Sequence, residues 1–157
     1  MGKNFIGLDT EKTAQLADSL NDLLSNYQIF SMNVRGYHWN IKGDNFFELH
    51  FKFEELYDDL LLKIDEIAER VLTLGHRPAH AYSTYIERSE VPERKDVSDG
   101  KEAMDNIVES FAKLIGKQRA LLSLAGDAED EGTVALMSDY ISQQEKTVWM
   151  YRSYLGH

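Results

Sequence analysis

The stretch that decides the fold runs from Asp44 to Leu74 and reads DNFFELHFKFEELYDDLLLKIDEIAERVLTL. Its large apolar residues recur every three or four positions, which is the spacing of one face of an α-helix. Gly75 and Pro78 follow directly and end the pattern. The segment therefore predicts a long amphipathic helix with one apolar stripe. The stripe consists of Phe46, Leu49, Phe53, Leu56, Leu60, Ile64, Ile67, Val71 and Leu74.

Three other segments carry the same periodicity. The clearest is the first, which has Asp9 or Thr10 as its N-cap and a heptad-like stripe ending near His38. The stretch from residue 76 to 97 holds both prolines and is long for a loop, so it predicts a crossover with one short helix. The expected helices are 10–37, 44–74, 79–86, 98–125 and 131–155. The sequence predicts one all-α domain over residues 1–157, a four-helix bundle.

Composition and charge limit the classes of function. The chain has 157 residues, no cysteine and a formal net charge of −10. Without cysteine it has no disulfide framework and no thiolate metal site. DNA affinity comes largely from lysines and arginines that neutralise phosphates, and no basic tail or patch is visible, so we expect no nucleic-acid binding. No apolar run approaches the roughly 20 residues of a membrane span, and residues 1–5 lack a signal-peptide pattern, so we expect a cytoplasmic protein.

Four residues with metal-binding side chains lie where one chain cannot easily bring them together. His50 and Asp65 belong to one predicted helix, and 15 residues of helix span about 22 Å, far more than a metal–ligand bond. Both nevertheless lie on one flank of that helix, with Glu69 one turn after Asp65. If two such helices pair antiparallel about a two-fold axis, His38 and His50 of one subunit meet Asp65 and Glu69 of the other. The sequence thus predicts two identical sites per dimer.

The flank that carries these ligands has a mixed composition. It is too apolar for a solvated face and too ionisable for a core, which is typical of a subunit interface. Bundles that hold two metals in their own core use Glu-x-x-His pairs, and this chain contains none. The ionisable residues are His50, Glu54, Asp65 and Glu69, and the residues between them include Tyr57, Leu61, Ala68 and Leu72.

Several motifs together resemble the Dps family of mini-ferritins. They are His38-Trp39-Asn40, Leu49-His50, Asp65-Glu66-Ile67-Ala68-Glu69-Arg70, Leu74-Gly75 with Arg77-Pro78, and Trp149-Met150-Tyr151. The resemblance covers nearly the whole chain and implies a ferritin-like bundle that assembles into a hollow homo-dodecamer with ferroxidase sites at two-fold interfaces. The ligands it implies are His38 and His50 of one subunit, Asp65 and Glu69 of its partner, and Glu54 as a less firmly assigned carboxylate.

This donor set also predicts the metal. Neutral imidazoles and carboxylates with open positions suit Fe(II) better than a closed structural zinc site, although zinc or another divalent metal could compete. The family resemblance implies a ferroxidase that oxidises Fe(II) with hydrogen peroxide or oxygen. It further implies that the shell stores the ferric product and protects the cell against oxidative stress.

Simpler interpretations of the same residues stay open at this stage. His38, at a helix end, could cap or pack rather than bind metal. Asp65 and Glu69, beside Lys63 and Arg70, could form ordinary helix-surface ion pairs.

Trp39 and an acidic cluster are secondary candidates. Trp39 is adjacent to His38 and is either a redox-active neighbour of the site or an interface packing residue. Asp127, Asp130 and Glu131 surround the start of the last helix, where acids complement the helix dipole. In the resembled family, carboxylates near this point line pores on the three-fold axes, so Asp130 and Glu131 are the first candidates for a pore, followed by Asp127.

Two other functions compete with iron oxidation. The first is DNA compaction by the same fold, which the acidic charge disfavours. The second is a purely structural helical oligomer whose interface histidines pack without metal. Anaerobic titration with Fe(II) separates the second from a ferroxidase.

Overall fold

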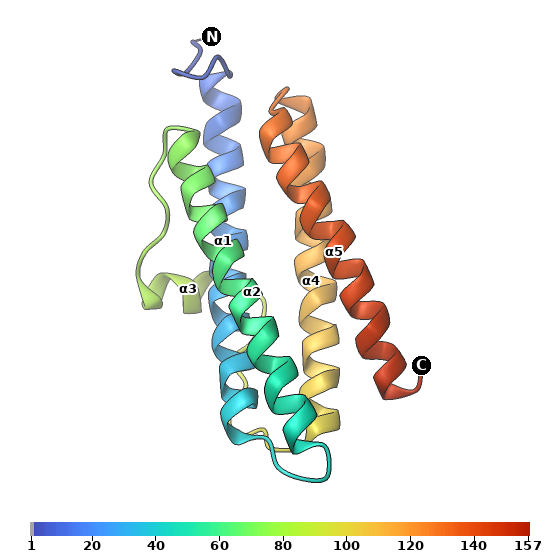
Figure 1. The fold of residues 1–157 in the computed structure, drawn as a ribbon. Helices are drawn as coiled ribbons and strands as arrows, with labels where there is room; N and C mark the ends of the chain where they lie inside the picture. Colours follow the sequence, from blue (N-terminus) through green and yellow to red (C-terminus); the bar gives the residue numbers. More distant parts are fainter. Residues whose placement is uncertain (1) are drawn as a thin grey trace.

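The computed structural model describes residues 2–157 and consists of five helices (Figure 1). Four long helices form the bundle, and a short one lies in the crossover between the second and third of them. The all-α four-helix bundle predicted from the sequence is confirmed. The helices are α1 (Thr10–Asn40), α2 (Phe46–Thr73), α3 (Tyr82–Arg88), α4 (Gly100–Asp127) and α5 (Glu131–Leu155).

α1 and α5 run in one direction through the bundle, and α2 and α4 run in the other (Figure 1). Short turns join α1 to α2 and α4 to α5. The end of α2 and the start of α4 lie at opposite ends of the bundle, so residues 74–99 pass along its length and carry α3 beside α1. No helix within residues 2–157 is long and apolar enough to span a membrane.

Aspartates begin three of the long helices. Asp9, Asp99 and Asp130 each accept a hydrogen bond from the backbone N–H three residues later. An N-cap side chain satisfies one of the four N–H groups that a helix leaves unpaired at its start, and such a cap contributes about 1 kcal/mol.

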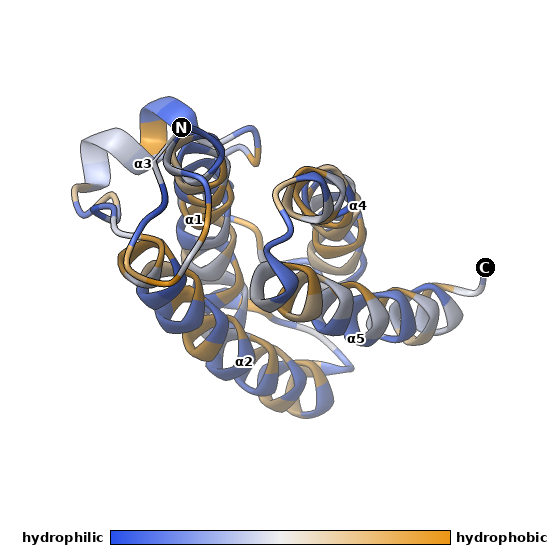
Figure 2. Ribbon diagram, turned by 90° about the horizontal axis from the view of Figure 1, so that it is seen from above, coloured by the Kyte–Doolittle hydropathy of each residue, from blue (hydrophilic) through white to orange (hydrophobic). Residues whose placement is uncertain are grey.

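The core is apolar along the inner faces of the four long helices. Viewed along the bundle, hydrophobic residues face inward and hydrophilic residues face outward on most turns (Figure 2). Phe30 of α1 meets Phe111 of α4 edge to face, with ring centroids 5.1 Å apart. Tyr37 of α1 meets Phe53 of α2 at 6.1 Å. The first contact joins α1 to α4, and the second joins α1 to α2.

One polar ring lies in the middle of this core. The Tyr27 hydroxyl donates to the Gln118 amide oxygen, Gln118 Nε2 donates to Gln144 Oε1 at 2.8 Å, and Gln144 Nε2 donates to the Tyr27 hydroxyl at 2.7 Å. All three side chains are buried. Because a buried polar group without a partner costs about 1–3 kcal/mol, the closed ring fixes the register of α1, α4 and α5.

Asparagines of α1 hold the crossover against the bundle. Asn21 bonds both Ala79 N–H and Arg77 C=O. Asn26 is fully buried, and its amide oxygen accepts the backbone N–H groups of residues 90 and 91. Asn33 accepts the N–H of residue 94 and donates to the carbonyl of residue 92. An asparagine side chain offers the same donor and acceptor as a backbone amide. These three side chains therefore satisfy backbone hydrogen-bonding groups of an irregular segment that has no helix or strand to do so.

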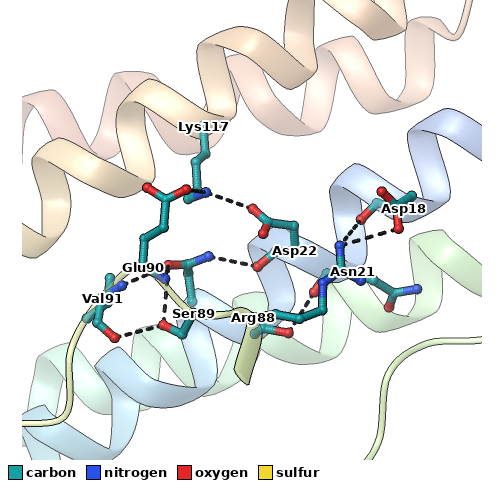
Figure 3. Close-up of polar contacts among 10 residues, drawn as sticks. Asp18, Asn21, Asp22, Arg88, Ser89, Glu90, Val91 and Lys117 are labelled. Carbon is teal, nitrogen blue, oxygen red and sulfur yellow. Dashed lines mark hydrogen bonds and ion pairs between the residues drawn. The ribbon is translucent and has the colours of Figure 1, made fainter. Parts of the chain in front are cut away.

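Charged residues reinforce the same attachment (Figure 3). Lys117 of α4 lies between Asp22 of α1, at 2.8 Å, and Glu90 of the crossover, at 2.9 Å. Arg88, at the end of α3, reaches Asp18 of α1 at 3.3 Å. The crossover is thus tied to two helices of the bundle at once.

Seven of the ten helix boundaries differ from those predicted, each by one to three residues. The first helix continues to Asn40, three residues beyond the predicted end. The short helix begins at Tyr82 rather than at residue 79, because Asn21 and the Tyr85 hydroxyl bond the backbone of Ala79 outside the helix. α4, which was expected to end at residue 125 before Gly126, runs on to residue 127. In the turn that follows it, Glu129 has a positive φ of +59°.

Candidate metal centre

His38 and His50 face each other across the turn between α1 and α2. His38 lies in the last turn of α1 and His50 in the first turns of α2. The Nδ1 atom of His38 lies 2.6 Å from the carbonyl oxygen of His50, and the Nδ1 atom of His50 lies 2.7 Å from the carbonyl oxygen of His38. The rings stack, with centroids 3.8 Å apart and planes 15° apart. The structure therefore brings together the two histidines that the sequence assigned to one subunit.

These reciprocal hydrogen bonds determine the tautomer of both rings. A carbonyl oxygen can only accept, so each Nδ1 atom carries the proton and donates it. In the neutral imidazole the lone pair is then on Nε2, the atom that can bind a metal. A backbone carbonyl in this position is the usual outer partner of a metal-binding histidine. The bond to His38 also explains why α1 extends beyond its predicted end, since His50 caps a carbonyl of the last turn.

Glu54, the remaining candidate ligand from the same end of α2, lies beside the histidine pair. It lies one turn after His50 on α2, and its Oε1 atom is 3.8 Å from Nε2 of His38. Its side chain is about half exposed, so the carboxylate can move toward or away from the histidines. Within residues 2–157, no three His, Cys, Asp or Glu side chains are arranged to hold one metal ion.

Asp65 and Glu69 lie further along α2, exposed, and separate from the histidine pair. The basic neighbours suggested by the sequence have other partners. Lys63 is buried and bonds both carboxylate oxygens of Asp59, and Arg70 bonds the carboxylate of Asp130 at 2.6 Å. Among the described residues, neither Asp65 nor Glu69 has a salt-bridge partner. Both carboxylates are therefore available to a group outside the subunit.

The position of Asp130 corrects the expectation that it lines a pore. Its side chain is only 1% exposed, because it caps α5, bonds the Thr133 hydroxyl and pairs with Arg70. A pore carboxylate must face solvent, and this one is used inside the subunit. Asp127 and Glu131 are exposed, and their pore role stays a prediction.

Two residues beside the histidines were not singled out from the sequence as site residues. The Tyr57 ring lies edge to face with His38, at 5.3 Å between centroids. The Arg35 guanidinium lies over the Tyr57 ring, 4.8 Å from its centroid. Their spacing was a usable signal, since Tyr57 is two turns after His50 and Arg35 is one turn before His38. Trp39 is 63% exposed and points away from the core.

Burial affects the ionisation of the neighbouring tyrosine of α1. Desolvation raises the pKa of Tyr37 to about 12. Its phenol therefore stays neutral near pH 7 and packs against Phe53 rather than acting as an anionic ligand.

Several apolar side chains are exposed on α2 and in a groove beside it. A groove of about 310 Å³ lies between α1, α2 and α3 and is lined in part by Met32, Leu61, Tyr82 and Ile86. Leu62 and Leu72 of α2 are also more than half exposed.

The chain is similar in sequence to a known family of proteins. The model of the ferritin-like domain family matches residues 17–157. The chain is 41% identical to the DNA protection during starvation protein of Porphyromonas gingivalis, over 94% of this chain and 93% of that protein. The chain belongs to the Dps family. The ferritin-like fold predicted from the sequence is confirmed with it.

Solved structures of Dps proteins agree closely with this fold. The Dps protein of Vibrio cholerae O1, described as a member of a broad superfamily of ferritin-like diiron-carboxylate proteins, has a TM-score of 0.97 and 56% identity, covering 99% of this chain and 98% of its own. The Dps protein of Bacillus brevis has a TM-score of 0.90 and 32% identity, covering 94% and 99% of the two chains. This chain is therefore a mini-ferritin in fold along its whole length.

Proposed function

We propose that this Dps-family protein is a ferroxidase and iron-storing cage whose iron sites are shared between two subunits. The observation that carries the proposal is the reciprocal bonding of His38 and His50 through their Nδ1 atoms, which leaves Nε2 of each ring for a metal, with Nε2 of His38 at 3.8 Å from Glu54. Two imidazoles and nearby carboxylates with open coordination positions are a donor set for Fe(II). The diiron-carboxylate superfamily of the Vibrio cholerae relative supports the same metal.

The second subunit supplies the missing carboxylates in this proposal. Two α2 helices that pair antiparallel about a two-fold axis place His50 of one opposite Asp65 and Glu69 of the other. The apolar residues on the same flank would be buried by that pairing. Within residues 2–157, Asp65 and Glu69 have no ion pair to give up, which lowers the cost of turning them toward a metal.

The reaction follows from the electron count. Hydrogen peroxide accepts two electrons, one from each of two Fe(II) ions, together with two protons, and leaves as two molecules of water. Paired oxidation avoids the one-electron step that would release hydroxyl radical. We propose peroxide as the oxidant, with oxygen as the alternative acceptor, and storage of the ferric product inside a dodecameric shell. Iron would enter along exposed acidic residues such as Asp127 and Glu131, where rings of like charge attract cations. Zinc could compete for the same ligands.

DNA protection, for which several relatives are named, is the second candidate function. Its support is the naming alone, whereas the net charge of −10 per subunit opposes binding to a polyanion.

The proposal is tested by mixing the protein with Fe(II) under anaerobic conditions and then adding peroxide or oxygen. Calorimetry should show saturable Fe(II) binding, and optical absorbance should show faster oxidation than in buffer. Sedimentation should give twelve times 18.0 kDa. Absence of saturable Fe(II) binding in an assembled shell would leave the structural oligomer as the better account.

A further inference from the structure

We propose that Tyr57, held by Arg35, is a positioning residue that orients His38 for metal binding. The inference rests on the proposed function, because it concerns the geometry of the same metal site. It assigns a role to two residues that supply no ligand of their own.

The contacts around His38 restrict its ring from several sides. His50 stacks on the ring, the His50 carbonyl accepts from Nδ1, and Tyr57 meets it at an interplanar angle of 71°. The remaining unbonded ring nitrogen, Nε2, is directed toward Glu54. The histidine side chain is only 7% exposed in the single subunit. Removal of the Tyr57 ring would open one side of His38 and allow the imidazole to rotate away from Glu54.

Tyr57 is in turn held by a cation–π contact with Arg35. Its ring is partly buried, and the Arg35 guanidinium covers it at 4.8 Å, within the range of a cation–π contact. Arg35 and His38 are neighbours on one face of α1, three residues apart, and both contact the same ring of α2. The two helices therefore hold Tyr57 between a cation and the imidazole that it orients.

Tyr57 also lies next to the proposed symmetry axis. The midpoint between His50 and the Asp65–Glu69 pair on α2 falls between Asp58 and Asp59, within two residues of Tyr57. In the antiparallel pairing, the two Tyr57 side chains would lie close to the axis, between the two metal sites. Formation of the dimer would then cover the tyrosine and tighten its contact with His38 at the same time.

The test uses Co(II), which binds such ligands without being oxidised under anaerobic conditions and whose visible spectrum reports its coordination. Titrations of the assembled shell compare wild type with Y57F, Y57L and R35Q. Y82L is the matched control, since it makes the same change at an exposed tyrosine of α3.

Loss of an outer contact of a metal-binding histidine typically weakens affinity by about 10–100-fold, so Y57L should bind Co(II) at least about tenfold more weakly. Y57F keeps the ring and should bind within about twofold of wild type, with an unchanged spectrum, while R35Q should fall between Y57F and Y57L. Y82L should match wild type. If Y57L does not assemble, R35Q decides the question, since unchanged affinity in that variant overturns the role of the pair.

Co(II) affinity in assembled Y57L equal to that of wild type would also overturn the inference, whatever the iron chemistry. Failure of the proposed function has a different signature. In that case wild type would bind Co(II) no more tightly than the H38A/H50A double variant does. The inference would then be contradicted together with the proposed function.

Discussion

At the scale of single residues, the most informative feature is that His38 and His50 each donate to the other's carbonyl. Each histidine thus has a structural role, because its Nδ1 atom ties α1 to α2, and a free Nε2 atom for chemistry. The sequence alone leaves capping and metal binding as competing interpretations of His38. The structure makes them compatible, because different ring nitrogens do the two jobs.

Replacement of His50 by alanine should slow Fe(II) oxidation by more than about 100-fold, because loss of a ligand should exceed the 10–100-fold effect of losing an outer partner. The shell should stay assembled, since the flank packs mainly through apolar contacts. The measurement is initial oxidation rate by absorbance, with sedimentation to verify assembly.

His80→Ala is the matched control, because His80 is exposed in the crossover and bonds only a nearby carbonyl. A wild-type rate in H50A would remove His50 from the site.

At the scale of elements, the crossover shows how far the sequence could be used for prediction. Helical periodicity predicts the four long helices and the existence of the short one. It does not predict that Asn21, Asn26 and Asn33 would hold the backbone of residues 77–94, because those partners are 56 to 65 residues away in the chain. Asparagines on the buried face of α1 were the available signal.

The candidate site, like the crossover, could be predicted from the sequence only in part. The residue types and their spacing predict the histidine pair and the carboxylates. The pairing of Arg70 with Asp130 could not be predicted, because it depends on how α2 packs against the start of α5. That single ion pair changes two interpretations. Asp130 no longer fits a solvent-facing pore, and Arg70 no longer serves as the ion-pair partner of Glu69.

The charged contact between Lys117 and Glu90 makes the attachment of the crossover depend on pH. Lys117 lowers the pKa of Glu90 below its ordinary value of 4.5, first by hydrogen bonding and then by its charge. A lowered carboxyl pKa stabilises the folded state above 4.5, and the stabilisation is lost as the pH falls through the folded-state pKa. Because Glu90 is exposed, the effect is at most a few tenths of a kcal/mol.

Glu90→Gln should therefore lower the urea midpoint slightly at pH 7, and the difference from wild type should vanish near pH 3. Partial burial of Lys117 opposes its charge, but its hydrogen bonds to Asp22 and Glu90 outweigh this and raise its pKa above 10.5. The lysine's contribution is thus present below pH 10.5 and lost as the pH rises through the folded-state pKa. An equal difference between wild type and E90Q at pH 7 and pH 3 would contradict this account.

The pairing of α2 helices can be tested by cross-linking, because the chain contains no cysteine and a single introduced one is unambiguous. In the proposed register the two copies of residue 61 are offset by about 7 Å along the helix axis, and those of residue 51 by about 22 Å, at 1.5 Å per residue. Leu61→Cys should cross-link to a dimer with a short bismaleimide.

Phe51→Cys, a more exposed apolar position on the same helix, should stay monomeric in denaturing gels. Cross-linking of the second variant but not the first would mean a different register or a different interface.

At the scale of the whole molecule, the net charge of −10 per subunit would be multiplied over an assembled shell. A shell of twelve such subunits would present a strongly repulsive field to DNA. Fold and family follow from the sequence with few exceptions, because amphipathic periodicity and ligand spacing are local properties. Assembly and partners depend on surfaces that only a second copy or a ligand completes.

Duplex DNA should therefore not be retarded by the assembled protein at physiological salt and neutral pH, because no basic arm offsets the acidic surface. Gel shift and fluorescence anisotropy measure this directly. Submicromolar binding that weakens steeply with salt would show that dispersed lysines and arginines form a patch on the shell.

The central claim, that each iron site is shared by two subunits, is tested most directly by complementation between two inactive variants. One carries H38A and H50A, and the other carries D65A and E69A. A mixed dimer holds one site with all four native ligands and one site with none. Random co-assembly in equal amounts should therefore restore about one quarter of the wild-type sites, measured as fast Fe(II) oxidation per subunit, while each variant alone stays inactive. No recovery in shells shown by mass spectrometry to be mixed would contradict the shared site.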